Sequence, residues 1–375
     1  MARDRYGYRR KPSVPRQVVV LVVLLAAIGG AAWWHFGRED TPPTHSNGPD
    51  GTPPKPPNGP NVAQGNGNGN GSRSRPNGSK VPKPPKPTNA QQAEAVKLYT
   101  AGMKLLNEKK PFEARRYLSQ ALLSGHLPTD RDTQAAQALM VLANEYILSP
   151  RADERDAYAK EYVLTGDDSK GLAAVERKLK LHVPWQAIII VSDARLSERV
   201  RKGLDLDLDK LEARSRGVRV GQRLKTIPGP CHAVIYRSRH LMDLYLHREG
   251  GDRVFVRRVP VGLGKYKGTP TGKWKVVNKQ VKGDYYPAPN SPLRPKGTIP
   301  YGQPDYAFGK KGLWLGLEGT SEETKGLTGY GIHSTSHQDS IGRDESEGCI
   351  RVGDNHIDLV FCMLYEKWAT VDIRP

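Results

Sequence analysis

A histidine and a cysteine near the C-terminus have the types and the spacing that acyl-transfer chemistry requires. His333 ends the run Tyr-Gly-Ile-His, and Cys349 follows 16 positions later, directly behind Gly348. A cysteine attacks a carbonyl as its thiolate, and a nearby imidazole is the usual means of forming that thiolate near neutral pH. Gly348 leaves room beside the sulfur, so the backbone N–H groups of Gly348 and Cys349 would face an oxyanion. The pattern indicates a cysteine acyl-transferase, which needs no metal and no cofactor.

The sequence around these two residues resembles the signature of the YkuD-type L,D-transpeptidases, which cross-link bacterial peptidoglycan. In that family a His-Gly or His-Ser pair is followed, after a loop, by Ser-x-Gly-Cys-x-Arg or Ser-x-Gly-Cys-x-Asn. Here residues 346–351 read Ser-Glu-Gly-Cys-Ile-Arg, and residues 269–274 also fit the family. The resemblance covers roughly residues 231–375. Two positions depart from the pattern, because Ser334 stands where glycine is commoner and Glu347 where histidine often precedes the Gly-Cys pair.

The resemblance implies a two-step reaction. Cys349 would be the nucleophile and His333 the general acid and base, with the backbone carbonyl of Ser334 on one ring nitrogen of the histidine. The thiolate would attack an L-to-D peptide bond of a peptidoglycan stem peptide and form a thioester, which an amine of a second stem resolves. In an L,D-carboxypeptidase or endopeptidase, the alternative of the same class, water would resolve the thioester. The alternative of another class is a non-catalytic anchor that binds the cell wall.

Three further residues of the signature are candidate substrate contacts. Arg351 would bind a carboxylate of a stem peptide in bidentate fashion, and the alternative is an exposed arginine on a strand. Tyr330 would line the acyl pocket, with a core aromatic residue as the alternative. Ser346 is predicted as a third substrate-binding residue.

Two other histidines and two other cysteines raise the alternatives of a zinc site and of a disulfide. His337 and His356 could join the histidine–cysteine pair in a zinc site, but the spacing is not a recognised zinc pattern, and zinc would occupy the thiolate. We therefore predict no metal. Cys231 and Cys362 would form a disulfide that leaves the nucleophile free, or they would be two buried thiols.

The N-terminus predicts export of the chain. Residues 1–16 are basic, and residues 17–36 contain an uncharged apolar run of 18 residues. At 1.5 Å per residue such a run would extend about 27 Å, close to the thickness of a hydrocarbon core. The run predicts a transmembrane anchor with a cytoplasmic N-terminus, and a cleaved signal sequence is the alternative. Either interpretation places the bulk of the chain in the cell envelope, outside the cytoplasm.

Composition separates the next part of the chain from the remainder. Residues 37–90 are rich in Pro, Gly and Asn, which predicts a disordered linker. The net charge of +19 raises nucleic acid as a partner, but export argues against nucleic acid and favours an anionic cell envelope.

Two small regions are predicted between the linker and the signature. Residues 91–160 have apolar residues at helical spacing, typical of a tetratricopeptide-like helix pair with a third helix, and any protein partner of this region is unknown. Residues 161–229 resemble a LysM module, a glycan-binding unit with two helices between two strands. Within it, residues 197–217 look inserted and carry an alternating Leu-Asp pattern. A module that only packs against its neighbours is the alternative.

Strand patterns predominate in residues 230–375. Residues 232–236 and 241–246 predict one hairpin, and residues 253–261 and 272–277 predict another. Gly and Pro recur between them every eight to twelve residues, which favours a β-sandwich or barrel. The predicted fold is therefore multidomain: a β-rich YkuD-like catalytic domain, preceded by an α+β LysM-like module, a short helical region, a linker and one transmembrane helix.

Overall fold

The computed structural model describes residues 87–287, 291–366 and 368–375. The predicted basic N-terminus, the apolar stretch 17–36 and nearly all of the predicted linker lie outside the described residues. Among the helices that are described, none has the length and apolarity that a membrane crossing needs. The predicted single-pass membrane localisation is corrected accordingly, since the described chain supplies no membrane-spanning helix.

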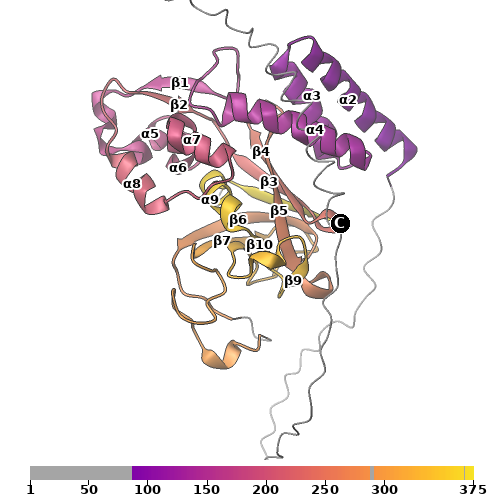
Figure 1. Ribbon diagram of the computed structural model, residues 1–375, viewed down its shortest axis with the longest axis vertical. Coiled ribbons are helices and arrows are strands. Elements are labelled where there is room, and N and C mark those ends of the chain that lie inside the picture. The colour runs from indigo at the N-terminus through magenta and orange to yellow at the C-terminus, as the bar shows by residue number, and fades with distance from the viewer. Residues whose placement is uncertain (1–86, 288–290, 367) are drawn as a thin grey trace, which may run out of the picture. The chain divides into compact units, whose positions relative to one another are not determined.

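Three helices begin the described chain: α2 (Asn89–Asn107), α3 (Pro111–Ser124) and α4 (Thr129–Leu142), the last continued by the π-turn η1 (Ala143–Ile147). They lie side by side in Figure 1. Thr88 caps α2 by accepting a hydrogen bond from the backbone N–H of Gln91. A Cβ added at Gly102 would lie 2.7 Å from Leu118 Cγ, so the glycine allows α2 and α3 to pack closely. The likeness to tetratricopeptide repeats stays a prediction.

Helices α3 and α4 cover one face of the strand-rich region. Leu118 and Leu139 share a buried cluster with Tyr245 and Phe255, which belong to strands. A network of charges lies beside this cluster: Arg258 donates to Asp243 at 2.7 and 2.8 Å and to Asp132 of α4 at 2.5 Å. Buried charges are tolerated when they are paired in this way. The helical region therefore contributes to the same packed body as the strands.

The predicted LysM-like segment has two strands with helices between them. Strand β1 (Lys160–Val163) pairs antiparallel with β2 (Arg223–Thr226), with Lys160 opposite Thr226. Between them lie the short helix η2 and the helices α5 (Leu172–Lys178), α6 (Trp185–Ser192), α7 (Ala194–Arg201) and α8 (Leu208–Arg216). Helix α6 is almost wholly apolar, and most of its residues are buried. Most of α7 and all of α8 lie in residues 197–217, the segment that looks inserted. The element order fits the prediction, while the LysM identity itself stays a prediction.

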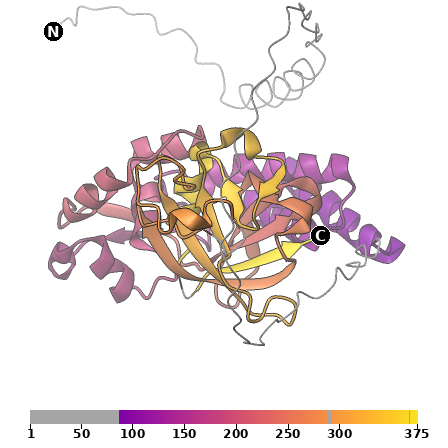
Figure 2. The same cartoon turned by 90° about the horizontal axis from the view of Figure 1, so that it is seen from below.

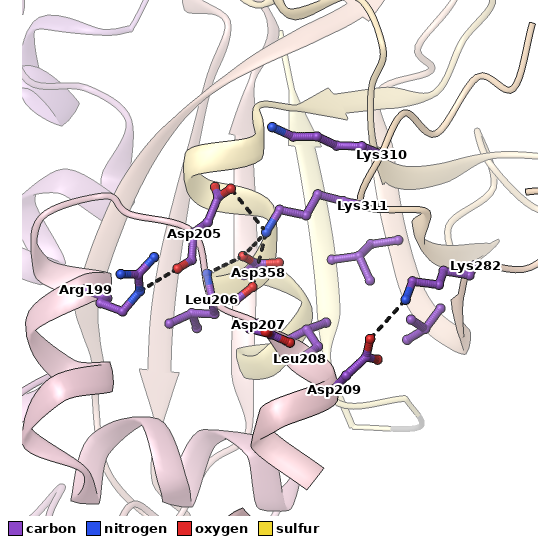
Figure 3. A pocket seen from close by; sticks show the side chains of 12 residues that line it. Arg199, Asp205, Leu206, Asp207, Leu208, Asp209, Lys282, Lys310, Lys311 and Asp358 are labelled. Atoms are coloured by element: carbon purple, nitrogen blue, oxygen red, sulfur yellow. Dashed lines mark hydrogen bonds and ion pairs between the residues drawn. The ribbon is translucent and has the colours of Figure 1, made fainter. Parts of the chain in front are cut away.

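The alternating Leu-Asp segment, residues 204–209, leads from α7 into the start of α8 and is held by lysines of the strand-rich region, as Figure 3 shows. Lys311 donates to Asp358 Oδ2 at 2.7 Å and to the carbonyl of Leu206 at 3.1 Å. The N–H of Leu206 also donates to Asp358 Oδ2, at 2.7 Å. At the other end of the segment, Lys282 pairs with Asp209 at 3.0 Å. The Leu-Asp repeat is thus a charged contact with the C-terminal domain.

Among the described residues of the C-terminal domain, nine strands form one sheet, in the spatial order β10-β8-β7-β6-β11-β3-β4-β5-β9. Pairing of Arg351 in β10 with Gly262 in β5 closes the sheet into a barrel. The C-terminal strand β11 lies inside the sheet, between β6 and β3 (Figure 2). The strands are β3 (Cys231–Tyr236), β4 (Leu241–His247), β5 (Arg253–Gly264), β6 (Gly272–Val281), β7 (Leu313–Gly319), β8 (Gly331–Ser334), β9 (Asp344–Ser346), β10 (Ile350–Val352) and β11 (Thr370–Arg374).

One of the two predicted hairpins is confirmed and the other is wrong. Strands β3 and β4 pair antiparallel, with Tyr236 opposite Leu241. Strand β5 does not pair with β6, because β5 pairs with β4, β9 and β10, and β6 pairs with β7 and β11. The connection between β5 and β6 is too long for a two-residue hairpin turn, and closure of the barrel supplies partners from distant parts of the chain.

Helix α9 (Asp354–Met363) follows β10 and is buried along most of its length. It carries Cys362, which is a buried free thiol, as is Cys231 in β3. Of the two alternatives for these cysteines, the structure therefore has the buried thiols and not the disulfide.

Candidate active site

Parallel pairing of two short strands brings the histidine and cysteine segments together. Ile350 of β10 lies opposite Ile332 of β8, and Arg351 lies opposite His333. Cys349 directly precedes β10, so it lies beside the start of β8. The site is therefore built on paired strands, which position side chains better than free loops do.

His333 is held as a neutral base. Its side chain is buried, with a relative exposure of 5%, and Nδ1 lies 2.5 Å from the backbone carbonyl of Ser334. Because a carbonyl only accepts, Nδ1 carries the proton and Nε2 has a free lone pair. The ring packs against Phe308 and Trp314, at 4.9 and 5.9 Å between ring centroids. Burial, with a smaller effect of the Arg351 charge, lowers the pKa of His333 to about 4.

Cys349 is a protonated thiol in this state. Its Sγ donates to the carbonyl of Gly329 at 3.5 Å, and not to His333. Burial raises the pKa of Cys349 to about 11, against the opposing effects of the Gly331 N–H and the Arg351 charge. Both groups are then neutral near pH 7, so a thiol that acts as a nucleophile here would have to lose its proton during the attack. This differs from the preformed thiolate that the sequence suggests.

Gly348 has a conformation that no other residue would adopt easily. Its φ is +137°, and an added Cβ would lie 2.9 Å from Tyr330 Cε1. Its N–H donates to Ser346 Oγ at 3.1 Å, and that hydroxyl donates to the carbonyl of Cys349 at 2.6 Å. In this structure the Gly348 N–H is therefore occupied by a side-chain acceptor, and Ser346 is buried in the turn. The oxyanion role of the Gly348 N–H and the substrate contact of Ser346 stay predictions.

Arg351 and Tyr330 both lie close to the reactive pair. Arg351 lies opposite His333, and its charge lowers the pKa of His333 and of Cys349. No carboxylate of the described residues lies within ion-pair distance of its guanidinium, so it can accept an anionic ligand. Tyr330 is half-buried, packs on Trp274 with 5.3 Å between ring centroids, and has its pKa raised by burial and by Cys349. Tyr330 thus lines the space beside the sulfur while also packing on the core.

Several residues of the site were missed in the sequence. Thr269 is fully buried, and its hydroxyl accepts from the Gly264 N–H and donates to the Gly348 carbonyl, both at 2.8 Å. Thr269 belongs to the Thr-Pro-Thr-Gly run that fits the YkuD signature, so the sequence contained a signal that could have identified it as a site residue. Phe308 and Tyr285 come from the long connection between β6 and β7, which has no periodic pattern. Burial raises the pKa of Tyr285, and the nearby Glu347 and Cys349 raise it further.

The other two histidines of the zinc alternative have different neighbours. His337 Nδ1 lies 3.0 Å from the hydroxyl of Ser336, and His356 lies against Gly203 at the end of α7. Within the described ranges, no group of three or more His, Cys, Asp or Glu residues is placed to hold a metal ion.

Comparison with known proteins finds a family match for the C-terminal domain. Residues 232–373 match the YkuD family, described as the L,D-transpeptidase catalytic domain. YqjB of Bacillus subtilis (strain 168), named as a candidate L,D-transpeptidase, is 33% identical over 95 residues. The aligned part is 25% of this chain and 45% of that protein, so the chain spans less than half of the relative's length.

Two solved structures are also similar in part. Bd1075 of Bdellovibrio bacteriovorus has a TM-score of 0.28 and 14% identity, over 39% of this chain and 48% of that one. The helical cell shape determining protein Pgp2 of Campylobacter jejuni has a TM-score of 0.24 and 11% identity, over 38% of this chain and 47% of that one. TM-scores this low do not establish a shared fold.

Proposed function

We propose that this protein is a peptidoglycan L,D-transpeptidase that acts through a thioester on Cys349. The observation that carries the proposal is the neutral imidazole of His333, whose Nδ1 is held by the Ser334 carbonyl, together with a thiol that directly precedes the strand paired with β8. The YkuD match of residues 232–373 supports peptidoglycan as the substrate. Peptidoglycan lies outside the cytoplasm, so the domain would act there.

The first step transfers an acyl group to the enzyme. As Sγ attacks the carbonyl carbon of the L-to-D peptide bond, His333 Nε2 takes the thiol proton and the carbonyl oxygen becomes an oxyanion. The C–N bond then breaks, and the departing amine of the D-residue takes the proton from His333. A thioester and a neutral imidazole remain.

The second step reverses these transfers with a new nucleophile. His333 Nε2 removes a proton from the amine of a second stem peptide as that amine attacks the thioester carbonyl. The C–S bond breaks, and the sulfur recovers its proton from the imidazole. If water enters instead, the same steps give an L,D-carboxypeptidase or endopeptidase.

The oxyanion needs at least one donor beside the sulfur. The N–H of Cys349 is our candidate, because the Gly348 N–H is bonded to Ser346 Oγ. A single such donor contributes about 3–4 kcal/mol to the transition state where it has been measured by mutation.

Mass spectrometry of the full chain tests the proposal. A carbapenem, which acylates nucleophilic cysteines of this type, should add to the wild type and not to Cys349→Ala. Cys231→Ala is the matched control and should still be acylated, since that thiol is buried. With a disaccharide tetrapeptide as donor and acceptor, the wild type should also form a cross-linked dimer. Acylation at another residue, or none in the wild type, would refute the proposal.

A non-catalytic wall anchor is the second candidate function, favoured by the pairing of β1 with β2 and by the helices that lie between these two strands. We propose that this segment binds the glycan, as a LysM module would. Full-length Cys349→Ala should then sediment with insoluble peptidoglycan although it cannot react. If it stays in the supernatant, the segment serves only to pack against the barrel.

A further inference from the structure

The turn between β5 and β6 lies against Gly348, the residue that precedes Cys349. It comprises Lys265, Tyr266, Lys267 and Gly268. A Cβ added at Gly264, where the turn begins, would lie 2.8 Å from Gly348 Cα, and one added at Gly348 would lie 3.1 Å from the Gly268 carbonyl oxygen. The Thr269 hydroxyl, which ends the turn, is bonded to the Gly348 carbonyl. The turn is therefore packed on the residue that precedes the nucleophile.

The backbone of this turn is strained at two consecutive positions. Tyr266 has φ of +52° and Lys267 has φ of +60°, in the left-handed region that favours glycine. Neither residue has the short polar side chain that eases this conformation for Asn or Asp. Strain of this kind is retained where the surrounding structure holds it, and it concentrates at ligand-binding and catalytic sites.

The strained conformation directs an aromatic ring and two cations into solvent. Tyr266 is 98% exposed, the most exposed large hydrophobic residue among those described. Lys265 and Lys267 are exposed too, and neither has an ion-pair partner among the described residues. Within the fold, this ring contributes no packing, because nothing covers it. An aromatic ring held open between two free ammonium groups fits a ligand with carboxylates and a flat or apolar face.

We propose that the Lys265–Lys267 turn is a specificity subsite that binds the acidic stem peptide of the substrate on one side of Cys349. This inference rests on the proposed function and names the part of the substrate that this surface would hold. The two ammonium groups would pair with stem carboxylates, and the Tyr266 ring would cover the adjoining peptide. The subsite would contribute to binding of the extended substrate and not to the chemical step.

Steady-state kinetics of full-length Tyr266→Asn test the subsite. Asparagine tolerates the left-handed conformation, so the turn keeps its shape while the ring is lost. For the disaccharide tetrapeptide, KM should rise about fivefold with kcat within about twofold, as expected when binding alone is lost. Carbapenem acylation, with a ligand too small to span the turn, should fall by a clearly smaller factor. Tyr266→Phe should restore the KM of the wild type.

Lys267→Asn tests the charge, and Lys109→Asn is its matched control. Lys109 is also an exposed lysine with left-handed φ, at +59°, but it lies in the turn between α2 and α3. Lys267→Asn should raise KM severalfold at low salt and less at high salt, whereas Lys109→Asn should not. An unchanged KM in Tyr266→Asn and Lys267→Asn would overturn the subsite. A wild type that is neither acylated nor active would instead refute the proposed function.

Discussion

At the scale of single residues, the candidate site contains two neutral groups that would exchange a proton in the proposed reaction. The pKa of His333 is lowered to about 4 and that of Cys349 is raised to about 11, chiefly by burial. In this state the imidazole can accept a proton above about pH 4, and the thiol keeps its own until about pH 11. The proposed reaction would therefore depend on general-base catalysis and not on a thiolate that is already formed.

The pH profile of acylation should reflect these two values. The second-order rate constant of carbapenem acylation should fall about tenfold per pH unit below pH 4, because protonated His333 cannot accept the thiol proton. It should be nearly constant from about pH 6 to pH 9. In Arg351→Gln the acid limb should move to higher pH, because the Arg351 charge lowers the pKa of His333. A limb near pH 8 in the wild type would instead indicate a free thiolate as the reactive species.

Gly348→Ala should abolish turnover and lower stability. The methyl group would meet the Tyr330 ring at a φ of +137°, so the turn before the nucleophile must shift. We expect a loss in kcat/KM of more than about 100-fold, because misplacement by 1 Å can cost that much. Gly326→Ala is the matched control, since Gly326 also has positive φ, at +78°, but has open space around it. Equal losses in both variants would contradict this account.

At the scale of elements, ion pairs join the α7–α8 segment to the barrel. Lys311 and Asp358 form a mostly buried pair, whereas the Lys282–Asp209 pair is exposed. Both lysines flank the connection that carries Phe308 and Tyr285. The segment therefore forms ion pairs at both ends of the β6–β7 connection, whose Phe308 packs against His333.

Lys311→Met should destabilise the protein by about 3 kcal/mol, because it leaves the buried Asp358 carboxylate without its cation. Lys282→Met, at the exposed pair, should change the free energy of unfolding little. Urea unfolding followed by tryptophan fluorescence measures both. If Lys311→Met,Asp358→Leu is as unstable as Lys311→Met alone, the loss does not come from an unpaired charge.

At the scale of the whole molecule, the described regions share their cores. Ile188 and Ile190 of α6 belong to the same buried cluster as the barrel strands, and Leu139 of α4 packs with Tyr245 and Phe255. A fragment cut at residue 229 would expose these surfaces. The predicted domains are therefore regions of one folded body between residue 87 and the C-terminus.

The described regions should consequently unfold together. Far-UV circular dichroism, tryptophan fluorescence and the reactivity of the buried Cys231 thiol should give one coincident urea transition. Leu139→Ala, although in the helical region, should shift the midpoint of all three probes, with a loss of about 2–5 kcal/mol. Separate transitions for helices and thiol would show independent domains.

The sequence by itself determined the reactive residue types, the β3–β4 hairpin and the strand-rich class of the C-terminal domain. These follow from short-range patterns, in which residue type, spacing and turn chemistry act over a few positions. Only the tertiary structure decided that Ser346 turns inward, that β5 pairs with β10 and that Lys311 meets Asp358. Such contacts join residues far apart in the chain. These contacts form because the barrel closes and because buried charges need partners, and neither requirement is visible in a short-range sequence pattern.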